Sequence, residues 1–76
     1  MFPNEIFAQR LKQLRTNSNI SMQKLADEIG LKNRGTISQF ETKITTPASD
    51  TLIALADYFN VSLDYLVGRS DSPDRK

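Results

Sequence analysis

Residues 21–41 read SMQKLADEIGLKNRGTISQFE and contain two short amphipathic segments separated by a turn. Ser21 is a favoured residue just before a helix, because its hydroxyl accepts a hydrogen bond from a free amide of the first turn. Gly30 is favoured just after one, since it enters the left-handed region without steric cost. The pattern predicts helices over residues 22–29 and 34–42. The second helix has a polar face that the core does not use.

Three further helices are predicted around this pair, from apolar residues at helical spacing. These segments and their expected N-caps are residues 5–17 with Asn4, residues 50–59 with Ser49, and residues 63–67 with Ser62. Asparagine and serine suit the cap position for the same reason as Ser21. No strand pattern and no internal repeat is present, so the predicted fold class is all-α with five helices.

The apolar positions of these helices supply one hydrophobic core. The expected core residues are Phe7, Leu11, Leu14, Leu25, Ile29, Ile37, Phe40, Leu52, Leu55, Phe59 and Leu66. A chain of 76 residues is large enough for one domain with its own core. We expect that domain over residues 1–68, followed by a polar, disordered tail over residues 69–76.

Composition excludes several classes of protein. The sequence contains no cysteine and no histidine, which removes disulfides, thiolate metal sites and the commonest general base. Its carboxylates are scattered, so we expect no enzyme activity, cofactor, metal site or small-molecule ligand. No apolar run approaches the ~20 residues of a membrane span, and no signal-peptide pattern opens the sequence. A cytoplasmic protein without a membrane partner is the expectation.

The charged residues are unevenly distributed along the chain, although the net charge is only +1. Residues 1–46 carry seven basic and four acidic residues, whereas residues 47–76 carry three basic and five acidic residues. One end of the molecule can therefore face phosphate groups. Chance scatter of surface charge explains the same distribution equally well.

Four segments carry a resemblance to a known family. They are FAQRLKQLR at residues 7–15, SMQKLADEIG at 21–30, TISQFE at 36–41 and PASDTLIALADYFNVSLDYLVG at 47–68. In this order and spacing they resemble the lambda-repressor and Cro type of helix-turn-helix regulator, the XRE family. The resemblance runs from Phe7 to Gly68. It implies a five-helix, lambda-repressor-like DNA-binding domain whose helix over residues 34–42 enters the major groove.

The resemblance also implies which residues contact DNA. The implied base contacts are Arg34, Gly35, Thr36 and Gln39, with Ser38 at their edge. The implied phosphate contacts are Gln23, Lys43, Thr45 and Thr46. The chemistry suits the assignment, because arginine pairs with O6 and N7 of guanine and glutamine with N6 and N7 of adenine. Without the motif, these side chains read as ordinary solvated surface.

Two further roles follow from the same comparison. Arg15 and Glu41 match positions that form a structural ion pair in the family and orient the second helix of the motif. Leu63 is either incidentally exposed or, with Asn60 and Asp64, part of a dimer contact. The implied function is a sequence-specific, double-stranded-DNA-binding transcriptional regulator, a repressor that binds an inverted-repeat operator as a homodimer. The alternative is a protein-interaction module of the same fold, an antitoxin or co-regulator that docks a partner protein.

The sequence departs from the family pattern at three places. Met22 replaces the usual phosphate-binding glutamine, and the neighbouring Gln23 points about 100° away around the helix. The stretch from residue 30 to 37 is one residue longer than in common members, which puts the register of the base contacts in question. Lys43 replaces the usual glycine, so the helix either continues or ends with a strained left-handed lysine.

Overall fold

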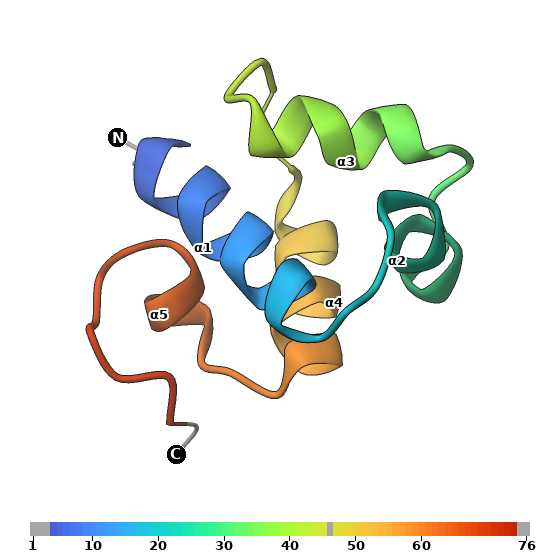
Figure 1. The fold of residues 1–76 in the computed structure, drawn as a ribbon. Coiled ribbons are helices and arrows are strands. Elements are labelled where there is room, and N and C mark those ends of the chain that lie inside the picture. Colours follow the sequence, from blue (N-terminus) through green and yellow to red (C-terminus); the bar gives the residue numbers. More distant parts are fainter. Residues whose placement is uncertain (1–3, 46, 75–76) are drawn as a thin grey trace.

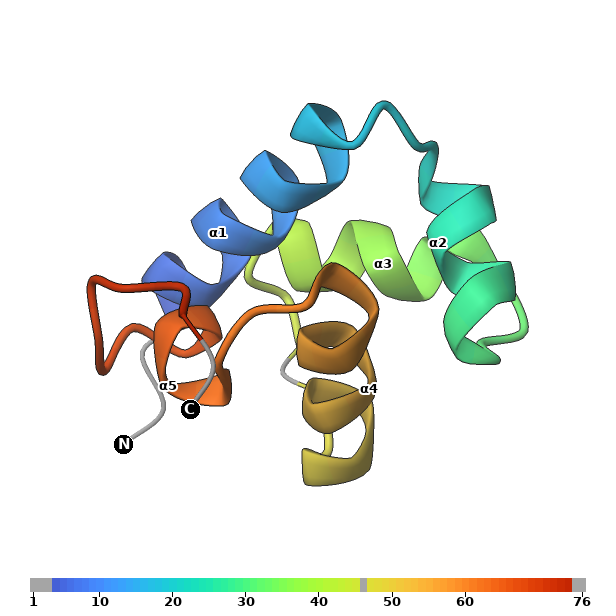
Figure 2. The same ribbon diagram turned by 90° about the horizontal axis from the view of Figure 1, so that it is seen from below.

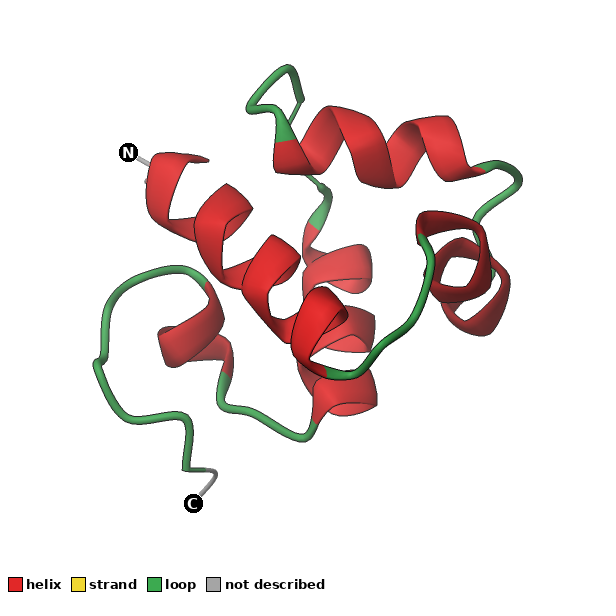
Figure 3. Ribbon diagram, in the orientation of Figure 1, coloured by secondary structure: helices red, strands yellow, loops and turns green. Residues whose placement is uncertain are grey.

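The computed structural model describes residues 4–45 and 47–74, and these ranges contain five helices. The helices are α1 (Asn4–Asn17), α2 (Met22–Ile29), α3 (Arg34–Glu41), α4 (Ser49–Phe59) and α5 (Leu63–Leu66). In Figure 1, α1 and α4 occupy the centre, α2 and α3 pack together on one side, and α5 lies on the other. Loops connect the helices and the described ranges contain no strand (Figure 3), which confirms the predicted all-α class.

Every helix contributes to one hydrophobic core. The largest fully buried side chains are Phe7, Leu11, Leu25, Ile37, Leu55 and Leu66. Phe7 of α1 meets Phe40 of α3 edge to face, with ring centroids 6.1 Å apart. Some expected core residues lie only partly buried at its rim: Leu14, Ile29, Leu52 and Phe59. A domain this small has too little interior to enclose every apolar side chain.

The N-terminal caps match the sequence at two helices and differ at two. The hydroxyl oxygens of Ser21 and Ser62 accept hydrogen bonds from the first turns of α2 and α5, each over 3.0 Å, as predicted. Asn4 was expected to cap α1, but it is the first helical residue. Ser49 was expected to cap α4, but it lies inside the helix, and Ala48 occupies the cap position without a side-chain bond.

The turn between α2 and α3 runs from Gly30 to Asn33. Gly30 has φ = 84°, and its amide donates to carbonyl oxygens in the last turn of α2. The chain then runs through residues 31–33 to Asn33, whose φ of −153° is extended, and α3 begins at the next residue. α3 and α5 end one residue before their predicted ends, with Thr42 and Val67 as C-caps. Figure 2 shows α3 running from beside α2 into the middle of the molecule.

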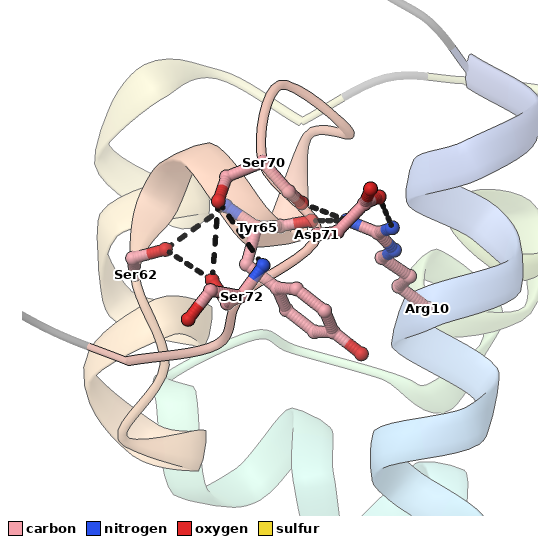
Figure 4. Close-up of polar contacts among 6 residues, drawn as sticks. All are labelled: Arg10, Ser62, Tyr65, Ser70, Asp71 and Ser72. Carbon is pink, nitrogen blue, oxygen red and sulfur yellow. Dashed lines mark hydrogen bonds and ion pairs between the residues drawn. The ribbon is translucent and has the colours of Figure 1, made fainter.

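Residues 69–74, which belong to the tail that the sequence predicts to be disordered, run against α1 and α5 (Figure 4). The amides of Arg69 and Ser70 donate to the carbonyl oxygen of Asp64 at 2.7 and 3.2 Å, and the amide of Ser62 donates to that of Pro73 at 3.0 Å. The segment is polar because hydrogen bonds, rather than apolar contacts, hold it.

No helix in the described part of the chain is long and apolar enough to cross a membrane.

Candidate nucleic-acid interface

α3 turns one face to the core and the other to solvent. Ile37 and Phe40 are buried, which fixes the rotation of the helix. The residues predicted to contact bases lie on the remaining surface: Arg34, Gly35 and Gln39 are exposed, and Thr36 and Ser38 are half-buried. Within residues 4–45 and 47–74, the side chains of Arg34 and Gln39 have no hydrogen-bond or ion-pair partner. Their donor groups are therefore available to a molecule outside the domain.

Asn33 is exposed at this surface, next to the residues that are predicted to contact bases. Its side chain makes no capping hydrogen bond, although it occupies the N-cap position of α3. A Cβ built onto Gly35 would lie 2.9 Å from Asn33 Oδ1, so the asparagine amide lies over the bare backbone of Gly35. The glycine was the signal in the sequence, because it leaves room for a neighbouring side chain on the exposed side of the first turn.

A shallow hollow separates the first turns of α2 and α3. It is lined by Arg15, Ser21, Met22, Gln23, Arg34, Gly35 and Ser38, and thus by two arginines and no acidic residue. Met22 packs against the core, so its side chain serves the fold. Gln23 is exposed, but its Nε2 donates to Asp27 Oδ1 at 2.9 Å within α2. A phosphate contact from Gln23 therefore has to compete with this bond.

The chain after α3 ends the helix with a left-handed lysine. Lys43 has φ = 68°, and the next amide, of Ile44, donates to the carbonyl oxygen of Gln39 at 2.9 Å. The left-handed alternative for Lys43 is therefore the one adopted, because the backbone bond of this helix ending requires it. Lys43 Nζ lies 3.8 Å from Glu5 Oε1, and both side chains are exposed. Thr45 is exposed beside it, and Thr46 lies outside the described residues.

Arg15 and Glu41 form a bidentate ion pair beneath this surface. Arg15 Nε lies 2.6 Å from Glu41 Oε2, and the second nitrogen reaches Oε1 at 3.1 Å. The side chains are 13% and 3% exposed, respectively. A third nitrogen of Arg15 donates to the carbonyl oxygen of Ile20 at 3.0 Å. The hydrogen bond to Glu41 raises the pKa of Arg15 above its ordinary value, against the opposing effect of burial. The pair joins α1 to the end of α3.

A comparison with family models identifies the family of this chain. A model described as helix-turn-helix matches residues 11–66, a range that includes the whole of α2, α3 and α4. The chain belongs to the XRE-type helix-turn-helix family. The resemblance stated from the sequence is confirmed, because the matched residues include both α2 and α3.

Curated relatives of this XRE-type domain come from Bacillus subtilis (strain 168). The uncharacterized HTH-type transcriptional regulator YobD is 37% identical over 71 residues, which cover 93% of this chain and 62% of YobD. The HTH-type transcriptional regulator ImmR is 32% identical over 63 residues, which cover 83% of this chain and 49% of ImmR. The chain thus spans between about half and three-fifths of the length of these relatives.

A solved structure shares the fold of the XRE-type domain. It is the P22 c2 repressor protein, crystallised in complex with a synthetic operator, with a TM-score of 0.79 and 28% sequence identity. The superposition covers 86% of this chain and 97% of the repressor chain. The five-helix, lambda-repressor-like architecture predicted from the sequence is therefore confirmed.

The residues expected at a dimer contact lie together at the corner between α4 and α5. Asn60 ends α4 in the left-handed conformation, with φ = 56°. Leu63 is 40% exposed and begins α5, and Asp64 follows it. The XRE-type domain therefore carries its predicted dimer residues at the end of α4 and the start of α5, outside the helix pair that carries the predicted DNA contacts.

Proposed function

We propose that this chain contains the DNA-binding domain of a sequence-specific transcriptional regulator, with α3 as the helix that reads the major groove. The observation that carries the proposal is the face of α3, whose exposed donors Arg34 and Gln39 have no partner in the described ranges. An α-helix of this kind fits the width of the groove. The likeness to a repressor crystallised with operator DNA supports the same conclusion.

Each polar residue of this face has a chemical counterpart on DNA. Arg34 is assigned to O6 and N7 of a guanine, and Gln39 to N6 and N7 of an adenine. The methyl group of Thr36 is assigned to a thymine methyl, with Ser38 at the edge of the contact. Gly35 lets the backbone approach the bases closely, because it projects no side chain.

Phosphate contacts are assigned to residues on both sides of α3. Gln23 borders the hollow at its first turn, and Lys43 and Thr45 follow its last turn. Thr46, which follows them in the sequence, is assigned to the same role. Such contacts fix the register on the duplex and make binding fall with rising salt, because counterions are released on association.

The regulator is proposed to bind as a homodimer to an inverted repeat and to act as a repressor. A single α3 reads too few base pairs for a specific site, and a second copy related by a two-fold axis doubles the readout. The α4–α5 corner with Asn60, Leu63 and Asp64 is the proposed contact between copies. Half-site centres are then about one helical turn apart, ~10 bp.

Selection from random duplexes with the purified chain, followed by sequencing, tests this proposal. We expect an inverted repeat, with a preference that Gln39→Ala relaxes at one base pair at a cost of ~1–3 kcal/mol in binding. Gln13→Ala, an exposed glutamine on α1, is the matched control and keeps the parental preference. Lys43→Ala is expected to weaken all sequences alike. No retention on duplex DNA at low salt contradicts the proposal and favours the protein-interaction module.

A further inference from the structure

Arg10 belongs to α1 but reaches across to α5 and to the segment that follows it. Its side chain is only 18% exposed. One guanidinium nitrogen donates both to the carbonyl oxygen of Tyr65 and to that of Ser70, the latter at 2.7 Å. The guanidinium also lies 4.2 Å from the centre of the Tyr65 ring. Figure 4 shows this arginine between the tyrosine and the returning chain, with Asp71 beside it.

The short helix α5 depends on such external contacts. It comprises only Leu63–Leu66, and a single turn of helix is not stable by itself. Leu66 anchors it in the core, and the hydroxyl of Ser62 caps its first turn. Arg10 places a positive charge on the carbonyl oxygen of Tyr65 in its last turn, which also accepts from the amide of Gly68 at 3.1 Å.

The segment held by Arg10 returns to the corner between α4 and α5. The hydroxyl and amide of Ser62 bond to Ser72 and Pro73, with the amide bond at 3.0 Å. Residue 62 lies between Asn60 and Leu63, inside the surface proposed for the dimer contact. One arginine therefore holds both the last turn of α5 and a segment that contacts this surface.

We propose that Arg10 is a positioning residue for self-association: by holding residues 70–74 against α5, it gives the α4–α5 corner the shape that a second copy of the chain recognises. The inference rests on the homodimer of the proposed function. The occupant is the second copy of that homodimer, because Ser62, which bonds to the segment, lies between Asn60 and Leu63 of the proposed contact. Leu63, 40% exposed, supplies the apolar centre of that patch.

The test compares Arg10→Gln with Arg69→Gln in the full chain. Arg69 lies on the same segment, is exposed, and makes no side-chain bond within residues 4–45 and 47–74, so its replacement changes the charge equally without touching the contacts of Arg10. Amide hydrogen exchange is measured at Ser62, Arg69 and Ser70, whose backbone donors hold the segment. Self-association is measured by sedimentation equilibrium, and on duplexes with one or two half-sites recovered by random-site selection with the parent chain.

Arg10→Gln is expected to speed exchange at these amides and to weaken self-association about tenfold, since charge-assisted bonds to two carbonyl oxygens are lost. Affinity for a single half-site is expected to stay at the parental value, which separates this role from a general loss of fold. Slow exchange at the core residues Leu25 and Ile37 verifies the fold. Arg10→Lys keeps the charge but not the planar fork, and is expected to fall between parent and Arg10→Gln.

Unchanged exchange at Ser62 in Arg10→Gln overturns the inference alone, and so does faster exchange there with unchanged self-association. Equal weakening by Arg69→Gln overturns it as well, because the effect is then one of net charge. A parent chain that stays monomeric on a duplex with two half-sites contradicts the homodimer itself, and the inference falls with it. These outcomes distinguish a failed inference from a failed proposal of function.

Discussion

Arg10 and Arg15 leave the same helix, α1, and each holds another part of the chain, but their partners differ in kind. Arg15 meets a carboxylate that is 3% exposed, at the end of α3. Arg10 meets backbone carbonyl oxygens and the ring of Tyr65, and its one carboxylate partner, Asp71, is fully exposed at 3.5 Å. The last turn of α1 is thus joined by paired charges, and its middle mainly by neutral acceptors.

This contrast teaches that the desolvation of the partner, more than the number of bonds, decides what an arginine contributes. Removing Arg15 leaves the buried carboxylate of Glu41 without its counter-charge, and that cost is large. Removing Arg10 leaves carbonyl oxygens next to the surface, where water replaces the lost donor. Replacing Arg15 is therefore expected to lower the free energy of unfolding more than replacing Arg10.

The largest expected effect is that of Arg15→Gln. It is expected to lower the free energy of unfolding by ~3–5 kcal/mol, because Glu41 keeps a buried charge without a partner. Urea denaturation of parent and variant measures this difference. The double variant Arg15→Gln with Glu41→Gln is expected to lose less than the sum of the single variants. A loss below about 1 kcal/mol in Arg15→Gln contradicts the contrast between the two arginines.

The next effect is that of Gly68→Ala, at the turn that leads into the segment held by Arg10. Gly68 has φ = 88°, and an added Cβ would lie 2.8 Å from Ile6 Cγ2. Left-handed strain and this overlap together are expected to cost about 2 kcal/mol. Gly30→Ala is the matched control, because φ is 84° there and an added Cβ meets nothing within 4 Å. Thermal unfolding of the two variants separates the cost of the overlap from that of the strain. Equal losses of stability contradict a cost from the overlap with Ile6.

Arg10→Gln comes third, with an expected loss of about 1–2 kcal/mol in the free energy of unfolding. Its carbonyl partners remain accessible to water once the guanidinium is gone, which limits the cost. Urea denaturation beside Arg15→Gln gives the comparison directly. A loss equal to that of Arg15→Gln removes the distinction between neutral and charged partners.

The smallest effect is that of Asp71→Asn. The carboxylate is fully exposed and lies 3.5 Å from Arg10, so solvent screens the pair. The midpoint of urea unfolding is expected to coincide with that of the parent. A clear decrease in the midpoint shows that this surface pair contributes to stability. The carbonyl oxygens then account for less of the contribution of Arg10.

Much of the fold was predictable because it depends on local patterns. Helical spacing of apolar residues located all five helices, and Ser21 and Gly30 marked the ends of α2 by their own conformational preferences. The hydrogen bonds of residues 69–74 were not predictable, because they run to backbone carbonyl oxygens, which every residue type provides. The start of α4 was missed for a related reason: the carbonyl of Ala48 suffices, and no cap side chain is needed.

The candidate site was predictable to the level of a helix face, and less so for single residues. The polar positions of α3 follow from the burial of Ile37 and Phe40, which periodicity already indicated. Two details depend on rotamers, which residue types alone do not determine. They are the hydrogen bond between Gln23 and Asp27 and the lack of a capping bond from the Asn33 side chain. The DNA contacts themselves stay predictions.

The left-handed Lys43 gives this domain an unusual signature for genetic experiments. Its φ of 68° suits glycine and asparagine far better than branched side chains. In a library randomised at codon 43, screening for folded protein should enrich glycine and asparagine and deplete valine and isoleucine. Screening the same library for promoter occupancy should retain lysine and arginine as well. The difference between the two enrichment profiles separates the conformational requirement of the backbone at this position from the contribution of the ammonium group.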